Sequence, residues 1–565
     1  MKVSINWLKE LVDLKASVEE LVKLLALRTI GTKEVTGQYI ELDMKGYNRA
    51  DLLSLRGVAR EIAAITDSQI TFENENPNKF PWVTQKLPET PVKVENPELA
   101  PVYCIVKIEG LKIGPSSKEW VNKLESSGIR SVNNLVDITN LLMVEYGQDM
   151  HAFDADCIAE QKLIVRLAKK GEQLTTLDGK RLQLSEEDLI IADPQKPVGL
   201  AGIMGGKDSE VSQNTQTIFL EITIFDPIAI RKSSHRHRLH SEAAKRVQHG
   251  LTRTNLLQSM SAAIKMYESL GGKVTAITLI GDLKDETKTV TLSQEKINSL
   301  VGVDISPEQV EDSLTKLGFT LASHIGSGNV IWEVTVPYWR LDINIEEDIV
   351  EEVARMYGYE KIPAKPLTDN IPNIEENPLF EALERLKQAL SKTGLTEVQT
   401  YSYYSSKVIL NSQFSIVNLI KVANPISSET EYLRDNLWPN LLEAVAKNIR
   451  NGVKDVAIFE VGKAYLIKNG LPEEPHRLAI ALSNSTDNPI AELYQIFQRL
   501  GSHLEGIKLN ADKKPGRETF HPTRSSVLEE DGKQVGFIAE IHPRIVNKFG
   551  IDQRVAVLEI EINNY

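Results

Sequence analysis

The acids between residues 342 and 352 form the most closely patterned set of reactive side chains in the sequence. If a helix begins near Glu346, then Asp348, Glu351 and Glu352 fall on one of its faces. Acids on one face repel one another by roughly a few tenths of a kcal/mol per pair, and carboxylate oxygens are the ligands that magnesium prefers. The spacing therefore leaves two interpretations open, a solvated helix face or a site for a cation or a basic partner.

A second set of polar residues interrupts the apolar runs between residues 128 and 250. Glu221 ends the run Ile218-Phe-Leu, where a buried carboxylate needs a hydrogen bond or a cation. Local sequence favours the simpler reading, an acid exposed to water at the end of a strand. The glycines between residues 202 and 206 suit either a turn that approaches a ligand or a plain tight turn, because no phosphate-loop lysine follows them.

Positive charge gathers in the short segment from residue 231 to residue 249. Arginine and lysine concentrated in this way are typical of contact with a nucleic-acid backbone. The histidines 235, 237 and 240 allow a zinc site by count, but no cysteine lies nearby to complete a usual ligand set. We therefore expect contacts with nucleic-acid phosphates, and the cations that begin the segment are Arg231, Lys232, Arg236 and Arg238.

Composition places the chain among ordinary globular proteins. Its 565 residues predict about three or four domains, and it is 41% apolar and 25% charged. Two cysteines cannot build a disulfide framework and agree with a reducing compartment. No secretory h-region and no run of 18 apolar residues occurs, so we expect a cytoplasmic protein that spans no membrane. A net charge of -13 argues against wholesale coating by nucleic acid but allows a local basic surface.

Two proline-rich passages, residues 76–101 and 363–378, are expected to be linkers that divide the chain. The N-terminal piece, residues 1–75, predicts an amphipathic helix at its start. It also predicts helices over 18–27 and from Asp51, which is the expected N-cap.

The region 102–270 mixes short strands with helices, and 286–362 predicts a small helical unit with a strand over 331–336. From 379 to 565 a long helix precedes many strand-like runs, which indicates an antiparallel-dominated sheet. The expected fold class is α+β, in several domains.

Six longer lines of the sequence together resemble the bacterial-type phenylalanyl-tRNA synthetase beta subunit, across nearly the whole chain. They are Asn48-Arg-Ala-Asp-Leu-Leu-Ser-Leu-Arg-Gly-Val-Ala-Arg-Glu, Val136-Asp-Ile-Thr-Asn, His151-Ala-Phe-Asp, Ala201-Gly-Ile-Met-Gly-Gly, Arg340-Leu-Asp-Ile-Asn-Ile-Glu-Glu-Asp and Phe459-Glu-Val-Gly.

The resemblance implies that residues 102–270 are an editing domain, which hydrolyses tyrosine wrongly esterified to phenylalanine tRNA. A synthetic pocket shaped for an apolar ring rejects an added hydroxyl by only about a hundredfold, so a second site is needed. Glu221 would accept the phenolic hydroxyl, while His151 and Ser241 would position the ester and its attacking water. The implied site residues are His151, Gly205, Glu221, Ser241 and Ala243.

The same resemblance implies a partner, the alpha subunit, which would activate phenylalanine with ATP in an assembly of two alpha and two beta chains. Residues 286–362 would be a winged-helix-like domain, and 379–565 a class II synthetase-like domain without catalytic function. The implied magnesium ligands, near the contact with the alpha subunit, are Asp342, Asp348, Glu351 and Glu352.

Some positions depart from the family pattern. Ser241 stands where threonine is usual, which loses a methyl group and predicts looser editing, and Asp149 stands where proline is usual. We expect residues 29–43 to be a simple connector in place of an OB-type tRNA-binding insert, and we expect the C-terminal anticodon-binding domain of the family to be absent. A free-standing tRNA deacylase and a structural subunit with an inactive editing site remain as alternatives.

Overall fold

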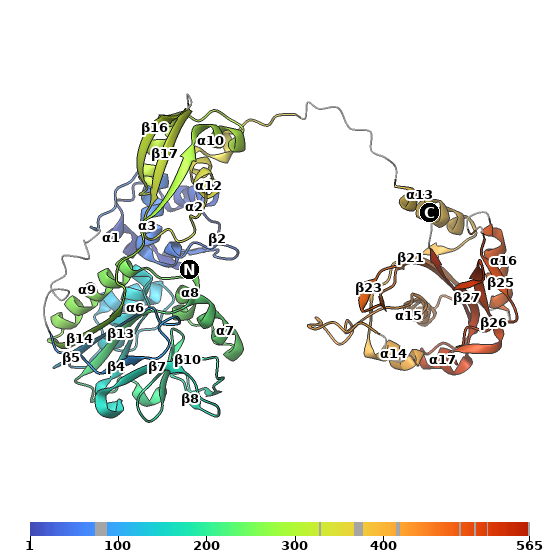
Figure 1. The fold of residues 1–565 in the computed structure, drawn as a ribbon, viewed down its shortest axis with the longest axis horizontal. Helices are drawn as coiled ribbons and strands as arrows, with labels where there is room; N and C mark the ends of the chain where they lie inside the picture. The colour runs from blue at the N-terminus through green and yellow to red at the C-terminus, as the bar shows by residue number, and fades with distance from the viewer. Residues whose placement is uncertain are drawn as a thin grey trace. The chain divides into compact units, whose positions relative to one another are not determined.

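The computed structural model describes residues 1–73, 87–326, 329–366, 377–413, 419–484, 488–501, 504, 506–516 and 518–562. The chain divides into two compact units, Met1–Pro366 and Leu367–Tyr565 (Figure 1). This division falls at the second proline-rich passage, of which residues 367–376 lie outside the described part. Helices occur with mostly antiparallel sheets in each unit, which confirms the mixed α/β, multidomain class.

The first unit begins with a small sheet, which the sequence did not predict. Its strands β1, β3 and β2 pair antiparallel. Residues 29–43, which were expected to be a simple connector, therefore contain the hairpin β2–β3. The first helix starts later than expected, because β1 precedes it. The helix expected from Asp51 begins instead after Ser54, whose hydroxyl accepts the Gly57 amide at 3.0 Å. The elements are β1 (Lys2–Ser4), α1 (Ile5–Leu11), α2 (Val18–Arg28), β2 (Thr32–Val35), β3 (Tyr39–Leu42) and α3 (Leu55–Thr66).

Two sheets form the middle of the first unit. One has the order β14-β5-β13-β6 and is covered by α6 and α9, and the other has the order β12-β11-β10-β7-β4. The bounds in the first layer are β5 (Val102–Glu109), α6 (Asn134–Tyr146), β6 (Met150–Asp154), β13 (Ile218–Ile224), α9 (Arg253–Ser269) and β14 (Lys273–Gly281). Those in the second are β4 (Val92–Val94), β7 (Leu163–Leu167), β10 (Leu189–Ala192), β11 (Pro197–Leu200) and β12 (Met204–Gly205).

Two of these strands lie outside the expected boundaries. β4 lies in the passage expected to be a linker, yet it pairs in parallel with β7. β14 follows the expected end at residue 270, yet it pairs with β5 along its whole length. Both are edge strands whose place depends on distant partners, so the local pattern did not reveal them.

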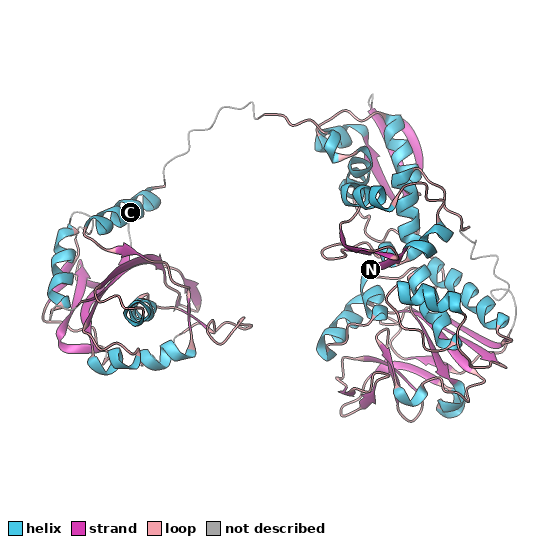
Figure 2. Ribbon diagram, turned by 180° about the vertical axis from the view of Figure 1, so that it is seen from behind, coloured by secondary structure: helices cyan, strands magenta, loops and turns pink. Residues whose placement is uncertain are grey.

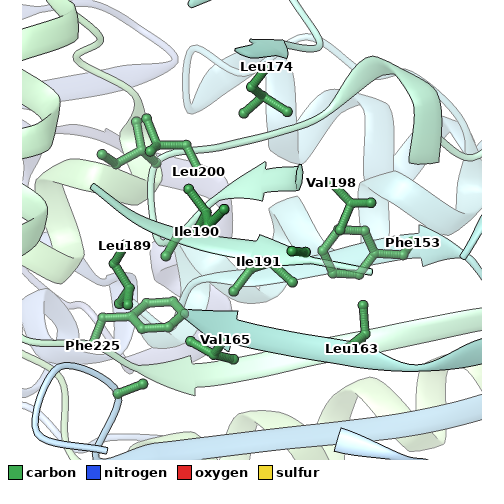
Figure 3. Close-up of a cluster of buried hydrophobic side chains, with 14 of the residues drawn as sticks. Phe153, Leu163, Val165, Leu174, Leu189, Ile190, Ile191, Val198, Leu200 and Phe225 are labelled. Atoms are coloured by element: carbon green, nitrogen blue, oxygen red, sulfur yellow. The ribbon is translucent and has the colours of Figure 1, made fainter. Parts of the chain in front are cut away.

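The apolar core between the two sheets fixes which side chains face inward (Figure 3). Side chains alternate along a strand, so odd and even positions of β13 lie on opposite faces. Phe219 packs into the core between the sheets, whereas Leu220 packs beneath α6 and α9. Glu221 therefore shares the face of Phe219, and by the same alternation His151 shares the face of Phe153 on β6.

The end of the first unit contains more strand than the expected helical domain. β15, β17 and β16 form an antiparallel sheet in that order, and Trp332 and Val334 of its central strand are buried among the helices. The bounds are β15 (Lys288–Ser293), α10 (Gln294–Val301), α11 (Pro307–Lys316), β16 (Thr320–Gly326), β17 (Asn329–Val336) and α12 (Glu346–Tyr357).

The second unit is built on a seven-stranded sheet of order β18-β21-β24-β28-β27-β26-β25, in which only β18 and β21 pair in parallel. Apolar residues cover both faces, and α15 lies within the curve of the sheet (Figure 2). An expected strand over 398–403 is replaced by the short β18 and β19. The main elements are α13 (Pro378–Lys392), β18 (Thr396–Glu397), β19 (Tyr403–Tyr404), α15 (Trp438–Arg450), β21 (Val456–Lys463), β24 (His476–Ser483), β25 (Lys508–Asn510), β26 (Phe520–Glu530), β27 (Lys533–Ile541) and β28 (Val555–Ile562).

Candidate functional site

A cavity of about 530 Å³ lies in the middle of the first unit, beside the inward face of β13. Strands β6 and β13 contribute one wall, and the turn that ends at β12 contributes another. The start of helix α8 (Glu242–His249) closes part of the rim. The structure brings all five expected editing residues to this one cavity, namely His151, Gly205, Glu221, Ser241 and Ala243.

Glu221 and His151 face each other directly across neighbouring strands of the sheet. The Glu221 side chain is buried, with 7% of the residue exposed, because β13 continues three residues beyond it. The expectation of a water-exposed acid at a strand end is therefore wrong. Among the described residues, neither Glu221 Oε1 nor His151 Nε2 has a hydrogen-bond partner, and each atom is buried. Such atoms cost about 1–3 kcal/mol each, a penalty that a polar ligand would relieve.

Burial also sets the protonation of these two groups. It raises the pKa of Glu221 to about 8; the Tyr103 hydroxyl opposes this and the Asp149 carboxylate adds to it. Burial lowers the pKa of His151 to about 4. Near pH 7 the cavity therefore presents a protonated carboxyl group and a neutral imidazole, both able to donate or accept a hydrogen bond.

Gly205 is required by its contact with the His151 ring. A Cβ atom at this position would lie 2.4 Å from His151 Cε1 and 2.5 Å from His151 Nε2. The ring is also held by an edge-on contact with Phe153, with 4.4 Å between centroids. The glycine-rich turn thus allows the backbone to lie against the imidazole.

Ser241 has a structural role as the N-cap of α8. Its hydroxyl accepts the Ala244 amide at 3.0 Å and donates to the Ile203 carbonyl at 2.7 Å. The single donor of the hydroxyl is therefore used, and Ser241 can offer a ligand only an acceptor lone pair. Ala243 lies in the first helical turn, where backbone N–H groups have no partner within the helix.

The expected tRNA-binding cations differ in whether they are already paired with acids of the chain. Arg231, Lys232 and Arg238 are exposed on helix α7 (Pro227–His237) and at its end. Arg236 is instead paired with Glu187 and with the fully buried Asp188, whose carboxylate also bonds His237 Nε2 at 2.6 Å. The described residues contain no group of three His, Cys, Asp or Glu side chains that could hold a metal.

The acids expected to bind magnesium are mostly neutralised by arginine. Both oxygens of Asp342 are taken by Arg340, at 2.9 and 2.7 Å. Buried Glu352 accepts from Arg340 and, at 2.6 Å, from Arg355. Asp348 accepts the Asn344 and Ile345 amides before α12, and Glu351 is exposed.

These four carboxylates do not fit a magnesium cage, since Asp342, Asp348 and Glu352 already accept hydrogen bonds within the chain, and only Glu351 is exposed with no such bond to another described residue. The solvated-face interpretation fails too, because Glu352 is buried. Arg355 also pairs with Glu61 of α3, so Glu352 belongs to an ionic network between α3 and α12, which Asp342 joins through Arg340.

Comparison with known proteins covers both units. Three family models match, described as "B3/4 domain" over residues 99–272, "tRNA synthetase B5 domain" over 290–359 and "Phenylalanyl tRNA synthetase beta chain CLM domain" over 362–562. The phenylalanine–tRNA ligase beta subunit of Yersinia pestis is 32% identical over 556 residues, covering 93% of this chain and 68% of that protein. The chain belongs to this beta-subunit family.

One further relative by sequence agrees with the assignment. The beta subunit of Geobacillus kaustophilus is 35% identical over 534 residues, covering 90% of this chain, and the chain spans 64% of that protein's length. A solved N-terminal fragment of the Pyrococcus horikoshii phenylalanyl-tRNA synthetase beta subunit has 18% identity, covers 63% of this chain and 99% of the fragment, and gives a TM-score of 0.34.

Two groups near Glu221 had no signal of their own in the sequence. Tyr103 lies near Glu221 because β5 and β13 pair, and only the alternation along β5 shows its face. Asp149 lines the cavity, but the sequence marked it only as a departure from the family. No helix in the described segments is long and apolar enough to cross a membrane.

Proposed function

We propose that this chain is the beta subunit of a phenylalanine–tRNA ligase and that its cavity removes tyrosine from mischarged phenylalanine tRNA. The observation that carries the proposal is the buried, unpaired Glu221 oxygen directly opposite His151 in a cavity of about 530 Å³. Such a volume falls within the usual range of small-ligand sites. The match to the B3/4 model over residues 99–272 covers this cavity.

Glu221 would select tyrosine by its phenolic hydroxyl. A site built to hydrogen-bond a substrate hydroxyl can reject the analogue that lacks it by about 10⁴–10⁵. With tyrosine bound, Glu221 Oε1 gains a hydrogen-bond partner that no described residue supplies. With phenylalanine bound, the same buried group stays unpaired, and correctly charged tRNA escapes hydrolysis.

The hydrolytic step needs a positioned water more than a strong base. Water adds to the ester carbonyl and the bond to the terminal ribose oxygen breaks. That oxygen takes up one proton of the water, and the other proton passes to solvent as tyrosine leaves as a carboxylate. Neutral His151 can accept a hydrogen bond from this water at Nε2. Ser241 can accept one further hydrogen bond, and the free amides at the start of α8 favour the developing negative charge on the ester oxygen.

Charging itself is assigned to an alpha-subunit partner that uses ATP, in an assembly of two alpha and two beta chains. In the second unit Arg434 pairs with Glu460 at 2.8 Å, and Arg477 pairs with Glu559 at 3.0 Å. These arginines are engaged within the chain, which supports a class II-like domain without its own aminoacylation site. The enzyme as a whole would use Mg²⁺ with ATP, and this chain contributes no step through that ion.

Phenylalanine tRNA would contact the exposed cations near α7, and a cytoplasmic location follows from this role in translation. The domain assignment that we propose keeps the expected editing domain but adds β4 and β14 to it, which extends it to residues 92–281. The small domain over 286–362 and the class II-like domain over 379–565 are unchanged.

The test compares the wild-type chain with Glu221→Ala, each co-purified with its alpha partner. Wild-type enzyme should release tyrosine from tyrosyl-tRNA, and the variant should lose this activity while charging phenylalanine normally. Charging by the isolated beta chain would contradict the division of labour. Full deacylase activity in a monomer would favour a free-standing deacylase, and deacylation that is equally fast or equally absent in both proteins would favour a structural subunit.

A further inference from the structure

The cavity contains one carboxylate more than tyrosine selection needs. Five acids line it: Asp149, Asp178, Glu210, Glu221 and Glu242. Three of them already have cationic partners within the chain. Asp178 pairs with Lys180, Glu210 with Lys207, and Glu242 with Lys245 and Arg246. Since Glu221 is assigned to the phenolic hydroxyl, Asp149 is the remaining acid without a function.

Asp149 is placed to contact the same ligand as Glu221. It immediately precedes β6 and lies two residues before His151, the direct partner of Glu221. Diagonal neighbours on paired strands are about 7–8 Å apart, which is of the order of the length of a tyrosine side chain. Glu221 also senses the Asp149 charge. The two acids therefore lie near each other on one wall of the cavity.

No cation of the described residues forms an ion pair with the Asp149 carboxylate, although the nearby Met150 backbone amide lowers its pKa. The nearest positive influence is Arg246, whose Nη1 is hydrogen-bonded to the carbonyl and carboxylate of Glu242 at 2.8 and 2.9 Å. A half-buried carboxylate of this kind is suited to a cationic group brought in by a ligand.

An aminoacyl ester carries such a group, its α-ammonium. We propose that Asp149 binds the α-ammonium group of the tyrosyl ester while Glu221 binds its phenolic hydroxyl. This inference rests on the proposed editing function and makes Asp149 a specificity-determining residue, one that requires an unblocked amino acid. Burial raises the pKa of Asp149 to about 6, with Arg246 opposing the rise, so the group is ionised at pH 7.5 and above.

The experiment pairs a variant with a substrate that lacks the cation. Asp149→Asn keeps the shape of the side chain but removes its charge. The substrates are tyrosyl-tRNA and tRNA esterified with the corresponding α-hydroxy acid, 3-(4-hydroxyphenyl)lactate. For the tyrosyl ester, Asp149→Asn should raise KM for deacylation about 10- to 100-fold, the usual range for a hydrogen bond to a charged group. For the hydroxy-acid ester, the variant and the wild type should agree within about twofold.

Two control variants sharpen the result. Asp178→Asn changes a cavity acid that already has partners and should affect neither ester. Glu221→Gln should slow both esters, because both carry the phenol. Equal slowing of both esters by Asp149→Asn, or no effect on either, would overturn the ammonium assignment.

A binding measurement separates this inference from the proposed function. If the wild-type enzyme hydrolyses neither ester, the editing activity fails, and calorimetry with two small amides then tests Asp149 alone. Tyrosine amide should bind the wild-type chain at least about tenfold more tightly than 3-(4-hydroxyphenyl)propionamide, and Asp149→Asn should abolish the difference. Equal binding of the two amides to the wild-type chain would refute the assignment.

Discussion

Substituting Gly205 with alanine should slow hydrolysis in the cavity by displacing the His151 side chain. The new Cβ would lie 2.4 Å from His151 Cε1, whereas ordinary contacts begin at 3.4 Å. The imidazole must therefore move by about 1 Å, and a displacement of that size can cost about a hundredfold in rate. The ring cannot retreat freely, because Phe153 lies against it. Overpacking of this kind also destabilises a protein by about 1–3 kcal/mol.

The assay for Gly205→Ala is deacylation of tyrosyl-tRNA under saturating substrate, together with the midpoint of urea unfolding. Gly199→Ala is the matched control, since Gly199 pairs directly with Gly205 but its added Cβ would approach no atom closer than 3.7 Å. We expect kcat to fall about a hundredfold for Gly205→Ala and to stay within about twofold for Gly199→Ala. An unchanged kcat in a folded Gly205→Ala protein would refute a role for the position of the imidazole.

Three further predictions concern charge. The pKa of Glu221 is about 8 in the folded state and ordinarily 4.5, so the unfolded state loses its proton first as pH rises. The free energy of unfolding should therefore fall between about pH 5 and pH 8. In urea titrations, Glu221→Gln should make this fall smaller. Glu352→Ala leaves two buried arginines undercompensated and should cost about 3–5 kcal/mol of unfolding free energy, whereas the exposed Glu351→Ala should leave the unfolding midpoint unchanged. Arg231→Ala should weaken tRNA binding and reduce its salt dependence, which filter binding measures. Arg236→Ala should mainly lower the stability of the protein, which thermal unfolding measures. The reverse pattern would contradict the assignment of these two arginines.

Helices were the part of the fold most readily predicted from sequence. The predicted helices over 18–27 and from Glu346 correspond to α2 and α12, because their apolar periodicity and their ends are local properties. Short edge strands such as β2 and β4 were missed, since their pairing partners lie elsewhere in the chain. The local residue pattern is enough to predict a helix, whereas pairing with distant segments decides whether a short polar run becomes a strand of a sheet.

The candidate site shows the same limit. The resemblance named five residues that line the cavity and gave roles to three of them, but it did not show the hydrogen bonds that their atoms already make. Ser241 was expected to position water, and its donor proves to be used in fixing α8 to the turn at Ile203. The acids of α12 were expected to bind a metal, but Glu352 is instead paired with Arg355, which also pairs with Glu61. Glu61 lies 294 residues from Arg355 in the sequence.

The pairing of Arg355 with Glu61 and Glu352 has a consequence for how the first unit comes apart. Sliding α12 away from α3 would separate these buried charges, at a cost of several kcal/mol, and would also break up the apolar cluster that Ala64 of α3 shares with Val350 and Val353 of α12. Salt would do little to ease that step, since ions screen buried pairs poorly. The N-terminal segment (residues 1–75) and the small domain (residues 286–362) should therefore unfold in a single transition, and neither should move independently of the other.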